Sequence, residues 1–466
     1  MIDVAAALEA VPHFDTFCSV EKLQSFVESL RTDSGDCEVE MLGRSGNGLP
    51  IHHIRYGRGS LKALFVAFPH PNEAIGGLTA LSLLSLLRQR NRALVDADIE
   101  WHIVPCIDPD GAKLNEGWSQ SAFSLDNYLR HFHRQENRDQ VEYSFPISHK
   151  RLVFDRPTRE ANLLKGLIAK VMPDFYYSLH NSAGAGGAYY LLTRTIPETY
   201  YLQLYQLLDQ YRVPLQLNLP YQDWVAQFGK GVFEILSTRK WYDCQERSTA
   251  FPEEILQTGA TSWEYLAQIK ESALTLLAEL PYVQHPSDGS TEPTVQNLRE
   301  LKLRVDADNK FITTVVLEEW DKVKEALDAA SPFYRKVVNG VISQKEKLYE
   351  GLPSWPSKTR DLLFNPAYSR AGTEGERFNV YFLERFFVLC HTHEFVRLLK
   401  VSTQTAAVRR AIGRLEALFD EALRRLDQEI GFDRFEVIDC DRLARLQLGS
   451  GLIVLNSMLE SGGALR

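Results

Sequence analysis

The sequence lacks the features that identify several common classes of protein. It has no GxxxxGKS or GxxxxGKT phosphate loop, no CxxC pair and no Gly-x-Ser-x-Gly turn, which weakens nucleotide-binding, redox and serine-hydrolase interpretations. No apolar run reaches the roughly 20 residues that span a bilayer. The first residues, Met1-Ile2-Asp3, lack the basic region of a secretory signal. We therefore expect a cytoplasmic protein that does not bind membranes.

Cysteine is scarce and is not arranged in pairs. The 466 residues include six cysteines, at positions 18, 37, 106, 244, 390 and 440. This scattered spacing predicts no disulfide framework and no cysteine-based zinc site. We expect free thiols in a reducing compartment, where disulfides are rare.

An excess of positive charge is also missing. Lysine and arginine number 52 against 61 aspartate and glutamate residues, for a formal net charge of -9. Nucleic-acid binding needs a basic face, so we expect no nucleic-acid partner. The 44% of hydrophobic and 24% of charged residues are ordinary for a globular protein.

The chain is longer than one hydrophobic core normally supports, since single cores stop growing at about 250 to 300 residues. A polar, turn-rich stretch begins at His285 and predicts a linker over residues 285–295. We expect a catalytic domain over residues 1–284 and a second domain over residues 296–466.

Strand and helix patterns alternate before this linker. Residues 75–90 and 158–171 have helical patterns, and residues 99–106 and 174–180 have strand patterns. The alternation predicts an α/β fold with a mixed, mostly parallel sheet and helices on both faces. In such sheets, ligands bind outside the carboxyl ends of the strands.

The pattern after the linker is helical. In residues 406–430, apolar side chains recur at steps of three and four, which is typical of an amphipathic helix. Residues 298–330 and 377–400 have similar patterns. We expect an α-helical domain of unknown role that packs on the first domain or forms a homo-oligomer.

A histidine and a glutamate follow an apolar, strand-like run at residues 64–68. His70 and Glu73 lie three positions apart on the loop that leaves this strand, so both can turn onto one metal ion. Zinc suits an imidazole nitrogen with a carboxylate oxygen, and a catalytic zinc site has three protein ligands. His180, which ends a second strand-like segment, is the candidate third ligand. We predict one zinc ion per chain.

Several further segments resemble the zinc carboxypeptidases related to carboxypeptidases A and B. Residues 44–51 (RSGNGLPI) are similar to a Gly-rich turn before a strand in that family. Residues 108–111 (DPDG) resemble its Asn-Pro-Asp-Gly turn, with Asp in place of Asn. Residues 259–265 and 272–280 resemble its closing loop, helix and strand. The resemblance spans roughly residues 35–284, in the family's order, and implies a metallocarboxypeptidase with His70, Glu73 and His180 as zinc ligands.

Two glutamates are candidates for the general base that takes a proton from water and passes it to the leaving amine. Glu279 ends an apolar strand-like run, which aims it at the carboxyl edge of the sheet. Glu264 lies in an expected helix with polar neighbours, where we expect a solvated face. We favour Glu279.

The resemblance also implies roles for residues around the metal. Glu142 matches an acidic residue that orients a zinc-bound histidine, here His70. Arg134 is the candidate for polarising the scissile carbonyl. Arg130 and Arg138 are further candidates for binding substrate, and Ser262 lies near the position that sets side-chain preference.

Substrate recognition departs from the family pattern. The family holds the terminal carboxylate with an Asn-Arg pair, where arginine can make two parallel hydrogen bonds. The matching residues here are Ser144 and Phe145, which cannot form that clamp. The family's capping tyrosine falls near Leu256. Three functions remain open: a C-terminal peptidase, which we favour, a zinc amidohydrolase acting on N-acyl amino acids or other small amides, and a non-catalytic binding protein.

Overall fold

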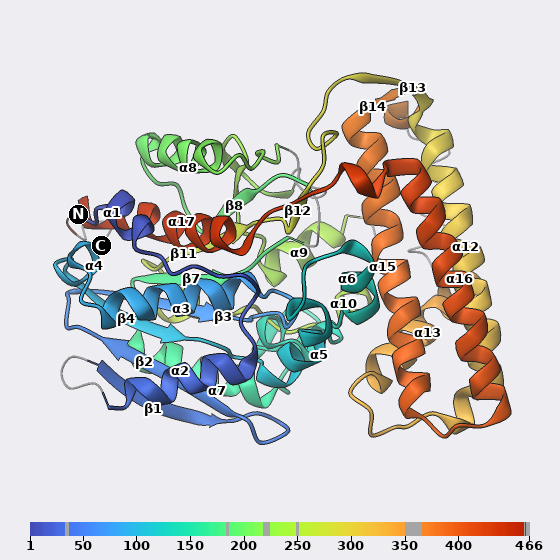
Figure 1. Ribbon diagram of the computed structural model, residues 1–466, viewed down its shortest axis with the longest axis horizontal. Coiled ribbons are helices and arrows are strands. Elements are labelled where there is room, and N and C mark those ends of the chain that lie inside the picture. Colours follow the sequence, from blue (N-terminus) through green and yellow to red (C-terminus); the bar gives the residue numbers. More distant parts are fainter. Residues whose placement is uncertain are drawn as a thin grey trace. The chain divides into compact units, whose positions relative to one another are not determined.

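The computed structural model describes residues 1–32, 37–182, 186–217, 224–247, 251–349, 366–460 and 462. The chain divides into two compact units (Figure 1). The α/β unit comprises Met1–Ala122, Asn137–Gln284 and Val437–Arg466. The helical unit comprises Phe123–Glu136 and His285–Glu436.

A nine-stranded sheet forms the centre of the α/β unit, in the order β1-β2-β4-β3-β7-β11-β8-β10-β9. Its strands are β1 (Cys37–Arg44), β2 (Pro50–Tyr56), β3 (Leu61–Ala67), β4 (Ile99–Val104), β7 (Phe175–Leu179), β8 (Tyr189–Leu192), β9 (Gln227–Gly229), β10 (Val232–Glu234) and β11 (Leu274–Glu279). The neighbours β4, β3, β7 and β11 run parallel, whereas β1, β2, β8 and β9 each make antiparallel pairs. A mixed sheet with a parallel centre is therefore present, as predicted.

Helices cover both faces of this sheet (Figure 1). The helices of the α/β unit are α1 (Val4–Glu9), α2 (Val20–Leu30), α3 (Ile75–Arg88), α4 (Arg92–Val95), α5 (Pro109–Ser119), α7 (Arg159–Val171), α8 (Glu198–Gln210), α9 (Thr238–Gln245), α10 (Pro252–Leu256), α11 (Ser262–Ile269) and α17 (Cys440–Glu460). Leu64 and Tyr176 point into a core shared with α7 and α11. Phe65 and Tyr177, one position further along each strand, point to the opposite face and contact Gly451 of α17. These two covered faces confirm the predicted fold class.

A local sequence signal explains the start of α5. Asp108 accepts a hydrogen bond from the amide of Gly111 at 2.8 Å, and Pro109 follows as the first residue of α5. An aspartate cap with proline at the first helical position is a favoured start. Asp110 in the same turn accepts hydrogen bonds from the Ser45 hydroxyl at 2.7 Å and the Asn47 amide at 2.8 Å. The Gly-rich turn before β2 and the Asp-Pro-Asp-Gly turn are therefore joined.

The last helix, α17, belongs to the α/β unit, although the sequence pattern placed residues 296–466 in one helical domain. Most of its residues are buried, and it packs against α3, α8, β7 and β11. An ideal Cβ on Gly451 would lie 2.7 Å from the Tyr177 ring. Glycine therefore lets the helix backbone approach the sheet closely. A helix that is buried over most of its length needs partners on several sides, which the sheet and the helices α1, α3 and α8 provide.

The helical unit is built from the long helices α12 (Leu298–Val323), α13 (Tyr334–Tyr349), α15 (Glu374–Val401) and α16 (Ala406–Ile430), together with the short helix α6 (Leu125–His131). The segment of α6 belongs here because Tyr128 and Phe132 pack on Phe386 of α15. The stretch predicted as a linker also belongs here. The His285 ring stacks on Phe378 at 4.4 Å, and its Nε2 lies 2.9 Å from the carbonyl oxygen of Ile430.

Short strands and a buried ion pair complete the description. β13 (Pro293–Asn297) pairs with β14 (Ala371–Thr373) in the helical unit, and β5 (Ile147–His149) pairs with β6 (Leu152–Phe154) in the α/β unit. β12 (Val283–Gln284) lies where the chain leaves the α/β unit, and β15 (Glu436–Val437) lies where the chain returns to it. In the helical unit, the buried carboxylate of Glu394 lies 3.0 Å from Nδ1 of His133 and 3.2 Å from Nδ1 of His391.

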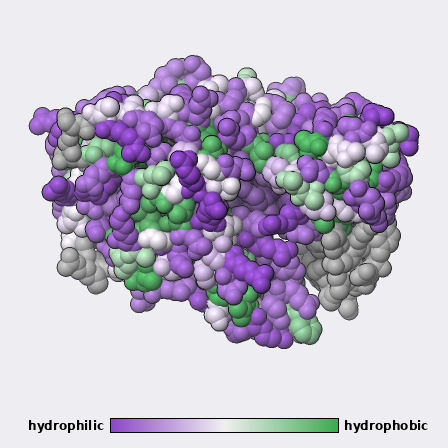
Figure 2. Space-filling model, turned by 90° about the horizontal axis from the view of Figure 1, so that it is seen from below, coloured by the Kyte–Doolittle hydropathy of each residue, from purple (hydrophilic) through white to green (hydrophobic). Residues whose placement is uncertain are grey.

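Hydrophilic residues dominate the face of the molecule shown in Figure 2, with smaller hydrophobic groups among them. Within the described residues, no helix has both the length and the apolar character needed to cross a membrane.

We predict opposite effects for alanine at two helical glycines of the α/β unit. Gly451→Ala should lower the free energy of unfolding by about 1–3 kcal/mol, because the new methyl group overlaps the buried Tyr177 ring. In Gly166→Ala, in α7, the new methyl group has no atom within 4 Å. This substitution should raise the free energy of unfolding by up to about 1 kcal/mol through helix propensity. Chemical denaturation of both variants measures the difference, and equal effects would contradict the close approach of α17.

Candidate metal centre

The parallel pairing of β3 and β7 brings two loops to the same edge of the sheet. Ala67 is the last residue of β3 and pairs with Leu179, the last residue of β7. His70 and Glu73 lie in the loop between β3 and α3, and His180 directly follows β7. The carboxyl ends of neighbouring parallel strands are where α/β sheets bind their ligands.

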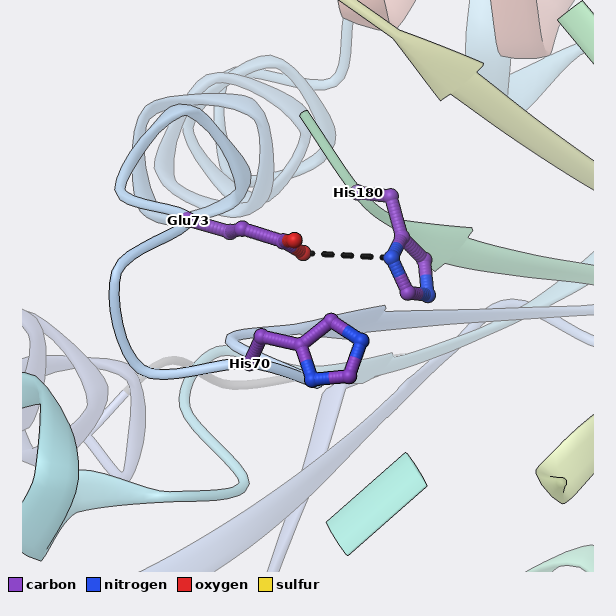
Figure 3. A group of neighbouring side chains, drawn as sticks. All are labelled: His70, Glu73 and His180. Atoms are coloured by element: carbon purple, nitrogen blue, oxygen red, sulfur yellow. Dashed lines mark ion pairs between the residues drawn. The ribbon is translucent and has the colours of Figure 1, made fainter. Parts of the chain in front are cut away.

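The three predicted metal ligands lie together at this edge (Figure 3). One donor atom from each of His70, Glu73 and His180 lies within 4.8 Å of the others. Glu73 Oε2 is 3.2 Å from His180 Nδ1, and the two imidazole rings have centroids 4.8 Å apart. All three residues are at most 3% exposed. Among the described residues, this is the one group of histidine, cysteine or acidic side chains with metal-site spacing.

The chain leaves β3 through an uncommon backbone conformation. Phe68 has a φ of 56°, in the left-handed region that bulky residues rarely adopt. An ideal Cβ on Gly77 would lie 2.9 Å from the Phe68 ring, so glycine leaves room for that ring. An ideal Cβ on Gly76 would lie 3.1 Å from the Leu179 Cβ atom. The two glycines at the start of α3 thus permit the tight passage from β3 to the helix.

The centre concentrates negative charge around one imidazole. His180 Nδ1 faces Glu73 and also lies 4.0 Å from Glu279, while its Nε2 lies 3.6 Å from Glu142. Burial lowers the pKa of His180, but these carboxylates outweigh burial and raise the pKa to about 10. Buried carboxylates need a positive partner to offset their desolvation. Two imidazoles and one carboxylate at this spacing therefore fit a divalent metal ion, which would supply that charge.

Glu142, expected beside His70, makes contacts around His180. It accepts hydrogen bonds from the Ser262 amide at 2.7 Å and the Ser178 hydroxyl at 2.9 Å. These two donors hold the Glu142 carboxylate 3.6 Å from His180 Nε2, close enough for an ion pair with the imidazole. Because Ser262 donates through its backbone, this contact does not depend on its side chain.

The structure separates the two candidate bases. Glu279 is the last residue of β11, is 9% exposed and approaches His180. The expectation that Glu264 lies on a solvated face is wrong. Glu264 is buried in the first turn of α11, where it accepts hydrogen bonds from the Thr238 and Arg239 amides and from the Arg239 guanidinium. Its polar neighbours in the sequence suggested exposure and gave no sign that Thr238 and Arg239 are its partners.

The three candidate arginines fall in different units. Arg130 and Arg134 belong to the helical unit, whereas Arg138 belongs to the α/β unit and is exposed. Arg130 forms ion pairs with Asp126 at 2.9 Å and Asp420 at 2.6 Å, so its guanidinium is already engaged.

The positions that depart from the family's carboxylate clamp are buried. Phe145 is inaccessible, and its amide donates to the carbonyl of Ala260 at 3.1 Å. The Ser144 hydroxyl is buried against Val141 and Thr158. Both residues are packed inside the α/β unit, so they cannot hold a substrate carboxylate.

Two buried residues near the ligands were missed in the sequence. Gln447 of α17 donates from Nε2 to the carbonyl oxygen of His180 at 2.6 Å and accepts from the Thr79 hydroxyl at 2.7 Å. The Tyr282 hydroxyl contacts both ligand-bearing loops. A lone glutamine in an apolar helix was a visible signal for Gln447, but the sequence could not show what it bonds.

The sequence matches no family model and no curated protein. Solved structures resemble it over a little more than half of its length. A protein classed as a metallopeptidase from Shewanella denitrificans OS217 is 16% identical, with 56% of this chain and 81% of that chain covered and a TM-score of 0.38. Carboxypeptidase A from Helicoverpa armigera is 15% identical, with coverage of 60% and 69% and a TM-score of 0.38.

A metallo-carboxypeptidase from Burkholderia cenocepacia is 15% identical, with coverage of 57% of this chain and 60% of that chain and a TM-score of 0.34. At these identities and TM-scores, the likeness assigns neither an activity nor a substrate. The function must come from the side chains of the site.

We predict that Gln447→Leu destabilises the α/β unit. Leucine fills a similar volume but leaves the buried carbonyl oxygen of His180 without this donor, at a cost of about 1–3 kcal/mol in the free energy of unfolding. Gln206→Leu, at an exposed position of α8, is the matched control and should change it by less than about 0.5 kcal/mol. Equal denaturation midpoints for the two variants would refute the role of Gln447.

Proposed function

We propose that the α/β unit is a zinc-dependent hydrolase that removes the C-terminal residue from a peptide. The observation that carries the proposal is the Glu279 carboxylate 4.0 Å from His180, within a buried group of three candidate ligands. Two histidines and one glutamate are a common ligand set of catalytic zinc, with a fourth position left open. Zinc held there would polarise a substrate carbonyl and lower the pKa of a water molecule.

The side chains then have distinct tasks. Glu279, at the end of β11, would take a proton from the attacking water and pass it to the leaving amine. Glu142 would keep His180 oriented while itself held by Ser178 and Ser262. Burial of the ligands lowers the local dielectric constant and strengthens each electrostatic contact.

An arginine would complete the site by stabilising the negative charge that develops on the carbonyl oxygen. We propose Arg134 for this task, with Arg138 as the alternative from the α/β unit itself. Arg138 and Ser262 are also proposed to contact substrate. Arg130 is the weaker candidate, because two aspartates already engage it.

A second candidate function is the hydrolysis of a small amide, such as an N-acyl amino acid. The burial of Ser144 and Phe145 favours it, because these positions offer no clamp for a peptide terminus. Both candidates use the same zinc ligands and the same base, so substrate experiments must separate them.

A peptide library in matched free-acid and C-terminally amidated forms separates these functions. We expect the zinc-loaded protein to release single terminal residues from the free acids alone, and a chelator to abolish the release. Mass spectrometry identifies the products. If stoichiometric zinc is bound and neither library is cleaved, the peptidase assignment fails and N-acyl amino acids become the substrates to test.

Glu279→Gln should retain zinc and lower kcat by about 10²–10⁴-fold, because the amide cannot accept the proton from water. Glu271→Gln, at an exposed position of the same unit, is the control and should keep full activity. Zinc content and turnover are measured on the same preparations. Substantial residual turnover in Glu279→Gln would move the role of base to Glu264.

His180→Ala should lose most of its zinc against a competing chelator, because two ligands seldom hold the ion. The control is His13→Ala, because the His13 side chain is 72% exposed. This variant should keep the wild-type zinc content. Metal analysis after dialysis measures occupancy, and circular dichroism verifies that both variants are folded. Full occupancy in folded His180→Ala would refute the proposed ligand set.

A further inference from the structure

The strand register determines the relative positions of the candidate ligands only in part. β3 ends at Ala67 and β7 ends at Leu179, so His70, Glu73 and His180 all lie beyond the paired residues. Two separate loops must therefore hold their ligands at a mutual distance that suits one metal ion. Metal sites need their ligating side chains placed to within about 0.5 Å, which requires support from surrounding residues.

The hydroxyl of Tyr282 joins these two loops. It lies 2.6 Å from the carbonyl oxygen of Asn72 and accepts a hydrogen bond from the amide of Ala74 at 3.0 Å. It also lies 3.0 Å from the side-chain oxygen of Asn181. Asn72 and Ala74 flank Glu73, and Asn181 follows His180. One oxygen atom thus contacts the immediate neighbours of two candidate ligands.

The Tyr282 ring is held so that this oxygen has little freedom. The residue is 1% exposed, and its ring packs edge-on against Phe17 at 5.4 Å and Trp118 at 5.2 Å. Its carbonyl accepts a hydrogen bond from the amide of Ile438 at 3.0 Å. Tyr282 also lies three residues after Glu279, so the segment that carries the candidate base carries this contact as well.

We propose that Tyr282 is a positioning residue of the metal centre, whose hydroxyl sets the distance between the His70–Glu73 loop and His180. It acts through Asn72, Ala74 and Asn181 and does not itself bind the metal. The inference rests on one part of the proposed function, that the three side chains bind a divalent ion. It does not depend on the substrate or on hydrolysis.

Tyr282→Phe tests the inference, because it removes the hydroxyl and keeps the packed ring. Loss of an outer contact of this kind weakens metal binding by about 10- to 100-fold. We expect that loss for Zn²⁺ in competition with a chromophoric chelator. We also expect the visible absorption spectrum of the Co²⁺-loaded protein to change, because the ligand geometry changes.

Tyr201→Phe is the matched control. Tyr201 is a buried tyrosine of the same unit, and its hydroxyl accepts a hydrogen bond from the amide of Ile196 at 3.0 Å. This variant removes a comparable buried hydrogen bond away from the ligand loops. It should lower stability to a similar extent and leave zinc affinity and the Co²⁺ spectrum at wild-type values.

The possible results separate this inference from the proposed function. If the wild-type protein binds neither Zn²⁺ nor Co²⁺, the metal centre itself is refuted. If the wild type binds both ions and Tyr282→Phe matches its affinity and spectrum, the positioning role is refuted. A Tyr282→Phe variant that is less stable but has the wild-type Co²⁺ spectrum would show a purely structural role and would also overturn the inference.

Discussion

The burial of three carboxylates beside one histidine is the constraint around which the α/β unit is organised. Glu73, Glu142 and Glu279 all approach His180 in a site that water barely reaches. Removing such charges from water is costly unless donors or cations replace the lost hydration. Donors from two other segments approach Glu142: the Ser178 hydroxyl in β7 and the Ser262 amide at the start of α11. The remaining negative charge is what a divalent ion would neutralise.

Residues far apart in the chain support this site. After β11 the chain leaves the α/β unit at Gln284 and returns at Val437, and α17 then contributes Gln447 beneath His180. The glycines of α17 allow that approach, since Gly451 lies against the Tyr177 ring. A helix from the last part of the sequence therefore contacts a candidate ligand, and such long-range contacts carry a loop-closure cost during folding.

Much of the architecture could be predicted from the sequence because it depends on local patterns. Apolar periodicity gave the positions of α3, α7 and α16, and the α/β class followed from the alternation of helices and strands. The grouping of His70, Glu73 and His180 could be predicted because all three follow strand-like runs, and parallel strands bring such positions to one edge. Glu264 was misjudged because its partners, Thr238 and Arg239, lie about 25 residues away.

The sequence by itself determined which donor atoms are available and which strand ends carry them. Residue spacing and hydrophobic periodicity are sufficient for that, because both act over one turn or one strand. Only the tertiary structure decided that Glu142 contacts His180, that α17 covers the sheet and that the Tyr282 hydroxyl joins the two ligand loops. These contacts join segments separated by about 40 to 390 residues. Over such separations chain connectivity sets no distance, and only packing and buried hydrogen bonding select the partner.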